Sequence, residues 1–170
     1  MGMKEAIGAL NELVELDVIK EYAVGGGTAS LAYLEPTLTF DVDVFVVFTD
    51  PTRIDALTPI YDVLKEKHGA TFDHEHPETI IVHGVAFQFL EATKGLLLDA
   101  CVGAREIDYE GTKVKVFTAE HLIAICLQVG RGKDYDRARM FKVAKAYDPT
   151  ALSLVLTKYN LNSKWNSLTV

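Results

Sequence analysis

Apolar residues recur along the chain with two different periods. Over residues 3–20 they repeat every three to four positions, which predicts an amphipathic helix. A short apolar segment at 21–24 then leads into three glycines, and the pattern over 28–34 predicts a second, short helix. The run FDVDVFVVF at 40–48 predicts the strongest strand of the chain, because it is almost entirely β-branched and aromatic apart from two aspartates.

The remaining sequence predicts helices and strands up to residue 117 and only helices after it. Asp50 and Pro51 are typical of a helix start, so we expect a helix over 52–67. Further strands are predicted at 71–75, 79–83, 85–92 and 113–117, and further helices at 119–129, 135–146 and 150–158. These elements predict an α/β (α+β) core in residues 1–117 and a helical C-terminal extension, 118–170, packed on it.

Composition and charge exclude several classes of protein. The chain has 170 residues, of which 49% are hydrophobic and 24% charged, as in ordinary globular domains. Seventeen basic residues against 24 acidic ones give a net charge of −7, which opposes general nucleic-acid binding but leaves room for a local basic pocket. We find no signal peptide and no apolar run of about 18 residues, so we expect a cytoplasmic protein without a membrane partner.

The two cysteines carry no sign of metal or redox chemistry. Cys101 and Cys126 lie in apolar runs and lack a metal-ligand spacing. We expect both to be small buried apolar side chains.

Two aspartates interrupt the strand at 40–48. Asp41 and Asp43 are two residues apart, so both carboxylates project from the same face of the strand, about 6.5–7 Å apart. Val42 and Val44 point the other way, into the core. Two carboxylates that face one point repel each other unless a cation lies between them, and a hard ion such as Mg²⁺ fits that position. The alternative is a half-exposed strand end with two solvated acids.

The glycine turn is the second candidate feature. Gly25, Gly26 and Gly27 follow a strand-like segment and open a helix, the context in which backbone N–H groups bind phosphate. Thr28 and Ser30 add hydroxyl groups. The turn matches neither the P-loop nor the dinucleotide-binding pattern, and by itself a triple-glycine turn is more often only a tight strand-to-helix turn.

Together the two features resemble the DNA polymerase β-like nucleotidyltransferase superfamily. The resemblance rests on residues 24–48, VGGGTASLAYLEPTLTFDVDVFVVF, in which a glycine turn, a short helix and a strand with Asp-x-Asp follow in the order of that family. The stretch 114–141 is similar to the strand-and-helix module of abortive-infection toxin-type members and their small bacterial relatives.

The resemblance implies a nucleotidyltransferase fold, which is a small mixed sheet flanked by helices, with a magnesium site and a nucleotide site. Asp41 and Asp43 would be the catalytic, Mg²⁺-binding carboxylates. Gly25, Gly26, Gly27 and Thr28 would bind the triphosphate of an NTP. A nucleoside monophosphate would then be transferred with loss of pyrophosphate, chiefly through positioning and electrostatics.

One position departs from the family pattern. Members usually carry a third carboxylate on a later strand, here the strand at 85–90, where Gln88 occupies the expected position. A neutral amide cannot act as a general base and is a weaker Mg²⁺ ligand. Glu91 is expected to face the opposite side of the strand, and Asp99 is only a remote substitute.

The densest basic segment follows the helix predicted at 119–129. Arg131, Lys133 and Arg137 are positioned to neutralise a triphosphate if the C-terminal helices fold back over the pocket. The alternative is a solvated connection with local ion pairs to Asp134 and Asp136. The resemblance favours Lys133 as a nucleotide-binding residue.

We therefore expect a Mg²⁺-dependent enzyme that transfers a nucleoside monophosphate from an NTP to a hydroxyl of an acceptor, which is a small molecule, a protein or an RNA end. The alternative is a catalytically silent nucleotide-binding protein, or a toxin–antitoxin-like interaction protein, of the same fold. A homodimer is a possible assembly.

Overall fold

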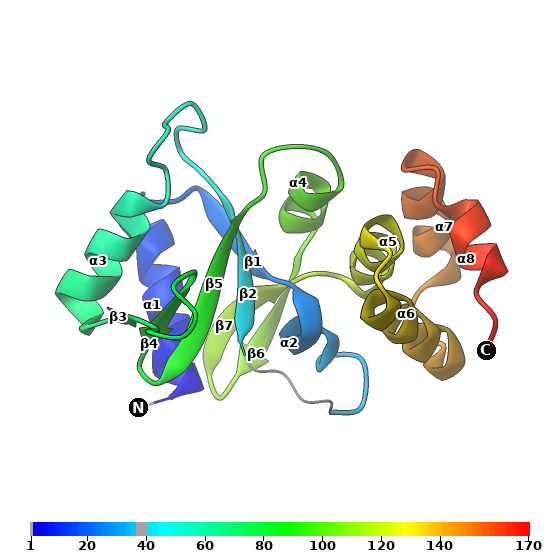
Figure 1. The fold of residues 1–170 in the computed structure, drawn as a ribbon, viewed down its shortest axis with the longest axis horizontal. Coiled ribbons are helices and arrows are strands. Elements are labelled where there is room, and N and C mark those ends of the chain that lie inside the picture. Colours follow the sequence, from blue (N-terminus) through cyan, green and yellow to red (C-terminus); the bar gives the residue numbers. More distant parts are fainter. Residues whose placement is uncertain (1, 37–40) are drawn as a thin grey trace.

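A computed structural model of the protein describes residues 2–36 and 41–170 and contains a mixed seven-stranded sheet (Figure 1). The strand order is β3-β4-β5-β2-β1-β7-β6. Strands β2 and β5 are parallel, as are β1 and β7, and the other neighbours are antiparallel. The strands are β1 Glu21–Val24, β2 Val42–Val47, β3 Thr71–Phe72, β4 Thr79–Val82, β5 Val85–Glu91, β6 Arg105–Tyr109 and β7 Thr112–Val116.

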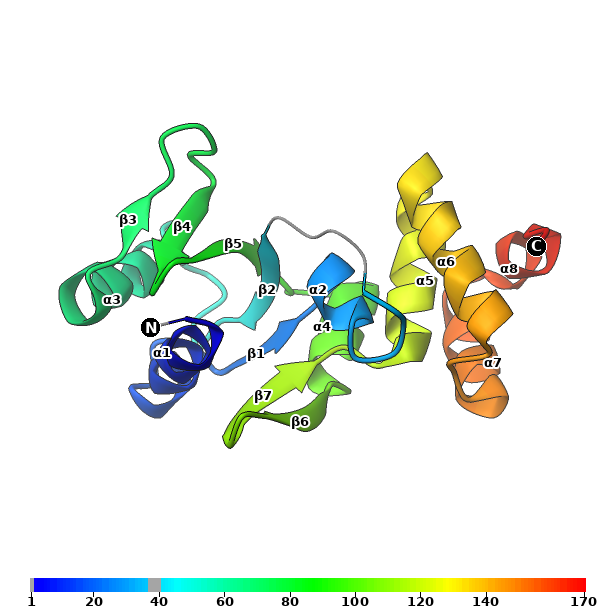
Figure 2. The ribbon, with the colours of Figure 1, turned by 90° about the horizontal axis from the view of Figure 1, so that it is seen from below.

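Helices cover both faces of the sheet. Helices α1 and α3 lie on one side, whereas α2 and α4 lie on the other, with α5 to α8 beyond them (Figures 1 and 2). The helices are α1 Met3–Glu15, α2 Gly26–Ser30, α3 Thr58–His68, α4 Gly95–Val102, α5 Ala119–Val129, α6 Gly132–Ala144, α7 Pro149–Lys158 and α8 Asn162–Ser167. None of the helices in the described residues combines an apolar sequence with the length that a bilayer crossing requires.

Successive side chains of β2 point to opposite faces of the sheet, so this strand contributes to the core on both faces. Val44 on β2 pairs with Phe89 on β5, and the Phe89 ring contacts Tyr61 of α3, so this face packs toward α1 and α3. Phe45 points to the other face, where its ring lies 4.8 Å from the ring of Phe117. Asp43 has the same parity as Phe45 and therefore lies on the α2 side of the sheet, whereas Asp41 comes just before the first residue of β2.

Most predicted strands are confirmed, with shifts of one to three residues at their ends, the largest in the strand predicted at 71–75, which ends at Phe72. The strand predicted at 40–48 begins at Val42, and its first residue, Phe40, lies outside the described residues. The mixed α/β fold class is also confirmed. The division of the chain after residue 117 stays a prediction, although every element that follows β7 is a helix.

The helix predicted at 52–67 is wrong at its start. Asp50 does not cap a helix, because its Oδ1 accepts hydrogen bonds from the backbone and the hydroxyl of Thr52, at 3.0 and 2.6 Å. This local turn competes with helix formation, and α3 begins only at Thr58. Gly69 ends it in the left-handed conformation, at φ 62°.

Four elements near or after the sheet differ from the prediction. Helices α4 and α8 and strand β6 fall where no element was assigned. Helix α6 starts three residues earlier than expected, because Arg131 and Asp134 cap it by reciprocal hydrogen bonds. Lys133 is therefore part of helix α6 and not of the connection before it.

The packing of Phe117 generates a stability prediction. Phe117 is completely buried against Phe45 at the junction of the sheet with α5. Replacing it (Phe117→Ala) leaves a cavity there, so we expect the free energy of unfolding to fall by about 3–5 kcal/mol in urea denaturation. Val143→Ala, on the exposed surface of α6, should change it by less than about 0.5 kcal/mol. Equal effects of the two substitutions would contradict this packing.

Candidate functional site

The glycine turn and the two aspartates lie against each other, although 13 residues separate Thr28 from Asp41. The backbone N–H of Gly25 donates a 2.9 Å hydrogen bond to the carbonyl oxygen of Asp43. A Cβ atom on residue 26 would lie 2.0 Å from Oδ2 of Asp43, inside the carboxylate itself. Gly26 also has a backbone φ of +59°, which residues other than glycine rarely adopt. The site therefore requires glycine at this position.

The other residues of the turn hold it in place. A Cβ atom on Gly25 would lie 2.5 Å from the ring of Phe45 and 2.8 Å from that of Phe117. Thr28 donates a hydrogen bond from its hydroxyl to the carbonyl oxygen of Asp41, at 3.1 Å. The Ser30 hydroxyl donates to the carbonyl of Gly26, within the same short helix. Both hydroxyls named in the sequence thus stabilise the turn.

Burial and charge act on Asp43 in opposite directions. Burial raises the pKa of the Asp43 carboxyl, and the neighbouring Asp41 carboxylate raises it further. Arg137, Lys133 and Arg131 oppose both effects. The start of α6 is therefore close enough to act electrostatically on Asp43, as the fold-back of the C-terminal helices predicts.

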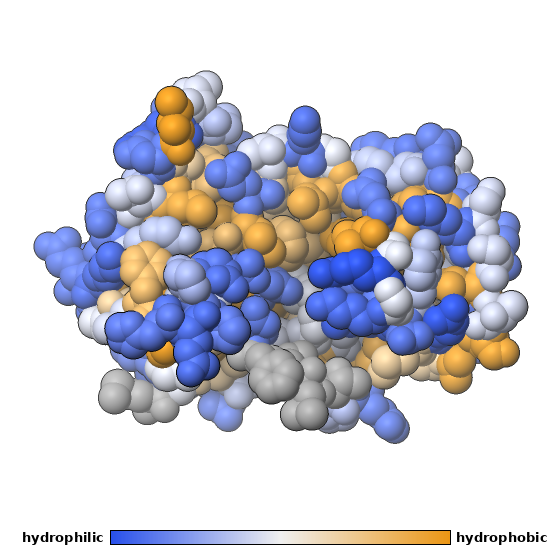
Figure 3. All heavy atoms as spheres, in the orientation of Figure 1, coloured by the Kyte–Doolittle hydropathy of each residue, from blue (hydrophilic) through white to orange (hydrophobic). Residues whose placement is uncertain are grey.

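The three cations at the start of α6 are not equivalent. Arg131 binds both carboxylate oxygens of Asp134, at 2.7 and 3.2 Å, and the hydrogen bonds from Arg131 hold the pKa of this carboxyl low against the opposing effect of burial. No ion pair involves Lys133 or Arg137 in the described part of the chain. Figure 3 shows the surface hollowed between the sheet and these helices, with strongly hydrophilic side chains along the helical side.

Gln88 stands beside Asp43. Strands β2 and β5 are parallel and in register at these two residues, so both side chains project from the same face of the sheet. Glu91 lies three residues along β5, on the opposite face. Asp99 is elsewhere, on α4, where it binds Lys158 and the hydroxyl of Tyr159. No group of three or more His, Cys, Asp or Glu side chains is arranged for a metal ion in the described residues.

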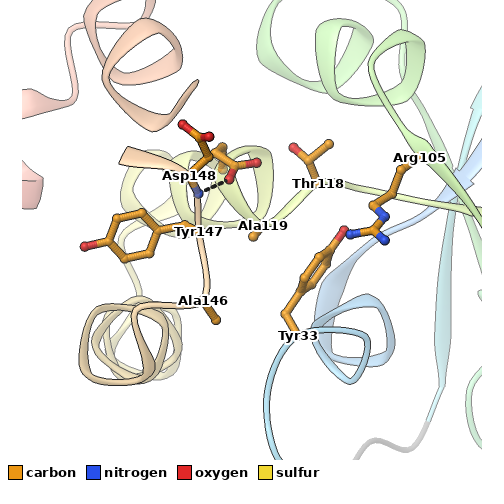
Figure 4. Close-up of a pocket in the computed structure, with 8 residues that line it drawn as sticks. Tyr33, Arg105, Thr118, Ala119, Ala146, Tyr147 and Asp148 are labelled. Carbon is orange, nitrogen blue, oxygen red and sulfur yellow. Dashed lines mark hydrogen bonds between the residues drawn. The ribbon is translucent and has the colours of Figure 1, made fainter. Parts of the chain in front are cut away.

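A cavity of about 350 Å³ lies apart from the aspartates, between the end of α2, the start of α5 and the α6–α7 connection (Figure 4). In it the Arg105 guanidinium lies over the ring of Tyr33, 5.6 Å from its centroid. The lining residues are Tyr33, Arg105, Thr118, Ala119, Glu120, Ala146, Tyr147 and Asp148. The sequence analysis did not find this cavity, because its residues come from four separate segments and form no motif.

Two sequence comparisons find no relative: no family model matches the chain, and no curated protein is significantly similar to it. Solved structures do match. A crystal structure of an antigenic nucleotidyltransferase-like protein from Paracoccidioides brasiliensis aligns with a TM-score of 0.56 and 19% identity, covering 98% of this chain and 93% of that one. The chain has a nucleotidyltransferase fold.

A second protein with the nucleotidyltransferase fold matches in two structures. ANT(2'')-Ia in complex with adenylyl-2''-tobramycin aligns with a TM-score of 0.54 and 11% identity, covering 95% of this chain and 97% of that one. The solution structure of this antibiotic-resistance factor also gives a TM-score of 0.54, with 14% identity over 98% and 96% of the two chains. At these identities the likeness concerns the fold.

The burial of Asp43 generates a pH prediction for the protein in EDTA. A carboxyl whose folded pKa is raised stabilises the fold below its unfolded pKa and loses that contribution as the pH rises through the folded pKa. We therefore expect Asp43→Asn to raise the free energy of unfolding at pH 7 and to lose this gain below about pH 3. Denaturation at a series of pH values checks it.

Asp62→Asn, at an exposed position of α3, is the matched control and should show no such gain. A variant Asp43→Asn that is less stable than the wild type at pH 7 would contradict the prediction, because the cations of α6 would then outweigh burial.

Proposed function

We propose that the protein is a Mg²⁺-dependent nucleotidyltransferase, which transfers a nucleoside monophosphate from an NTP to an oxygen of an acceptor. The observation that carries this proposal is the contact of Gly26 with the Asp43 carboxylate, on which cations of α6 also act. Two carboxylates, a glycine turn and positive charge would then surround one point. A triphosphate with its metal ion needs these three features.

The donor set fits magnesium. Asp41 and Asp43 offer hard carboxylate oxygens, and Gln88 beside them adds an amide oxygen. Bound Mg²⁺ would neutralise charge on the phosphates and lower the repulsion between the two aspartates. The pKa of Asp43 stays raised because burial and the Asp41 charge outweigh the cations of α6 in the protein alone.

Each of the chain's own groups has a defined part in the transfer. Gly25, Gly26, Gly27 and Thr28 form the turn against which the phosphates bind, since its three glycines have no side chain to keep phosphate away from the backbone. Lys133 stabilises the negative charge that develops on the leaving pyrophosphate. The acceptor oxygen forms a bond to the α-phosphorus, and the bond from that phosphorus to the β-phosphate oxygen breaks.

The structural neighbours support the class of reaction. ANT(2'')-Ia is bound to adenylyl-2''-tobramycin, an adenylylated acceptor, in one of its structures. This ligand supports nucleotidyl transfer as the reaction that we propose for the present chain.

Gln88 favours a second candidate function. A site with two carboxylates and a neutral amide in the third position suits binding of an NTP without its turnover. The protein would then be a nucleotide sensor or an interaction protein.

Transfer of label from [α-³²P]NTP, together with pyrophosphate release, tests the proposed function. We expect Mg²⁺-dependent turnover that falls by roughly 10²–10³-fold in Asp43→Asn, because a charge that positions the metal is lost. Asp62→Asn should retain full activity. If the wild type turns over no faster than Asp43→Asn with any of the four NTPs, the proposed enzymatic activity is contradicted. Tight Mg²⁺·NTP binding in the same samples would then support the second candidate function.

Gly26→Ala tests the turn. The added Cβ meets Oδ2 of Asp43, so the carboxylate must move, and we expect Mg²⁺·ATP affinity in calorimetry to fall by about 10-fold or more. Gly84→Ala is the matched control, because Gly84 has a φ of +82° but nothing within 4 Å of the added atom. Both variants should lose stability through backbone strain, whereas only Gly26→Ala should lose binding. Equal affinities would contradict the proposed phosphate site.

A further inference from the structure

We propose that the acceptor is a small phosphomonoester, whose attacking oxygen is already ionised at neutral pH, instead of the hydroxyl expected from the sequence. The inference rests on the proposed function and concerns its second substrate. It follows from a chemical requirement of the transfer and from which groups surround Asp43.

A neutral hydroxyl needs a base in this reaction. Its proton must leave as the oxygen bonds to phosphorus, and enzymes supply a side chain within hydrogen-bond reach to accept it. A carboxylate or a neutral imidazole suits this role, whereas an amide, a guanidinium or an ammonium group does not.

The sheet around Asp43 offers no such base. The residues of the nearby strands that share its face are Ala86, Gln88 and Leu90 on β5, Thr79 and Ile81 on β4, and Ala23 on β1. Asp41 and Asp43 are the proposed metal ligands. Glu21 also shares this face but pairs with Val47, about 13 Å along β2, and binds Lys115 at 3.1 Å.

The helical side of the site offers cations. Arg131, Lys133 and Arg137 act on Asp43, and the one buried acid among them, Asp134, is bound by Arg131. Residues 37–40 add no base, because their sequence is Thr-Leu-Thr-Phe.

The histidines of the chain are engaged or exposed elsewhere. On the α1 and α3 side, His68 lies 2.6 Å from a carboxylate oxygen of Glu12 and 3.1 Å from the ring nitrogen of His83. His121 contacts the hydroxyl of Thr118 at the start of α5. The remaining two, His74 and His76, are exposed between β3 and β4.

A phosphomonoester removes the need for a base. Its oxygen carries the negative charge before it attacks, so no proton has to be accepted. The oxygen's electron pair forms the new bond to the α-phosphorus, and the electrons of the broken bond leave with pyrophosphate. The product is a phosphoanhydride. Arg137, which has no carboxylate partner among the described residues, supplies charge for the phosphate of the acceptor.

The size of the acceptor follows from the charge of the whole chain. A net charge of −7 repels a polyanion such as RNA at every phosphate outside the site. A single phosphate group meets only the local cations at the start of α6, so the charge pattern favours a small phosphomonoester.

Matched acceptor pairs test the proposal with the full-length wild type, Mg²⁺ and [α-³²P]ATP. Glycerol 3-phosphate is compared with glycerol, and ribose 5-phosphate with ribose. We expect faster pyrophosphate release with the phosphorylated member of each pair, and phosphoanhydride signals in the ³¹P NMR spectrum of the product. Phosphodiester products, or equal rates with both members, would overturn it.

Gln88→Glu supplies the base that the proposal says is missing beside Asp43. It places a carboxylate beside Asp43 with little change of shape, so transfer to glycerol and ribose should rise by roughly 10²-fold or more. Asn160→Asp, the same amide-to-acid change at an exposed position, should leave every rate unchanged. Unchanged rates with hydroxyl acceptors in Gln88→Glu would contradict the missing base as the reason.

A binding measurement separates this proposal from the proposed function. Calorimetry titrates glycerol 3-phosphate into the protein saturated with Mg²⁺ and the non-transferable analogue AMPCPP, and we expect binding that glycerol does not show. Absence of AMPCPP binding would contradict the proposed function itself. Binding of AMPCPP without a response to either phosphomonoester, in rate or in heat, would overturn only the acceptor.

Discussion

The close approach of Gly26 to the Asp43 carboxylate is the contact on which the rest of the candidate site depends. The carboxylate occupies the space that a Cβ on residue 26 would fill, and the positive φ of Gly26 turns the chain from β1 into α2 at that point. Any other residue would displace Asp43 or open the turn. Phe45 and Phe117 close the opposite side of the turn by packing on Gly25, so the site is held from the core as well.

Charge gives this geometry its chemical character. Asp43 is buried beside Asp41, an arrangement that disfavours both negative charges, and the cations of α6 compensate it only in part. The protein keeps an unfavourable pair of acids where a metal ion and a triphosphate would make it favourable. The overall charge of −7 describes the surface, whereas the site combines two acids with three cations and a neutral amide.

Local patterns predicted most of the sheet, because alternation and β-branched residues act within single strands. Local patterns gave wrong predictions where a side chain forms a hydrogen bond with a nearby residue, or where an element has no periodic pattern of apolar residues. Asp50 binds Thr52 instead of capping a helix, and the edge strand β6 is largely exposed, so its polar residues do not alternate with a core. Helix α4 was missed because it is buried on several sides and has little amphipathic pattern.

The sequence alone determined the composition of the site: a glycine turn, two aspartates at a spacing of two, and a glutamine where an acid was expected. These are properties of neighbouring residues, which local geometry is sufficient to interpret. Only the tertiary structure decided that Asp43 lies against Gly26, that β5 runs parallel to β2 with Gln88 in register, and that α6 returns its cations to the same point. Strand order and helix return depend on packing between distant segments, and no local period specifies that packing.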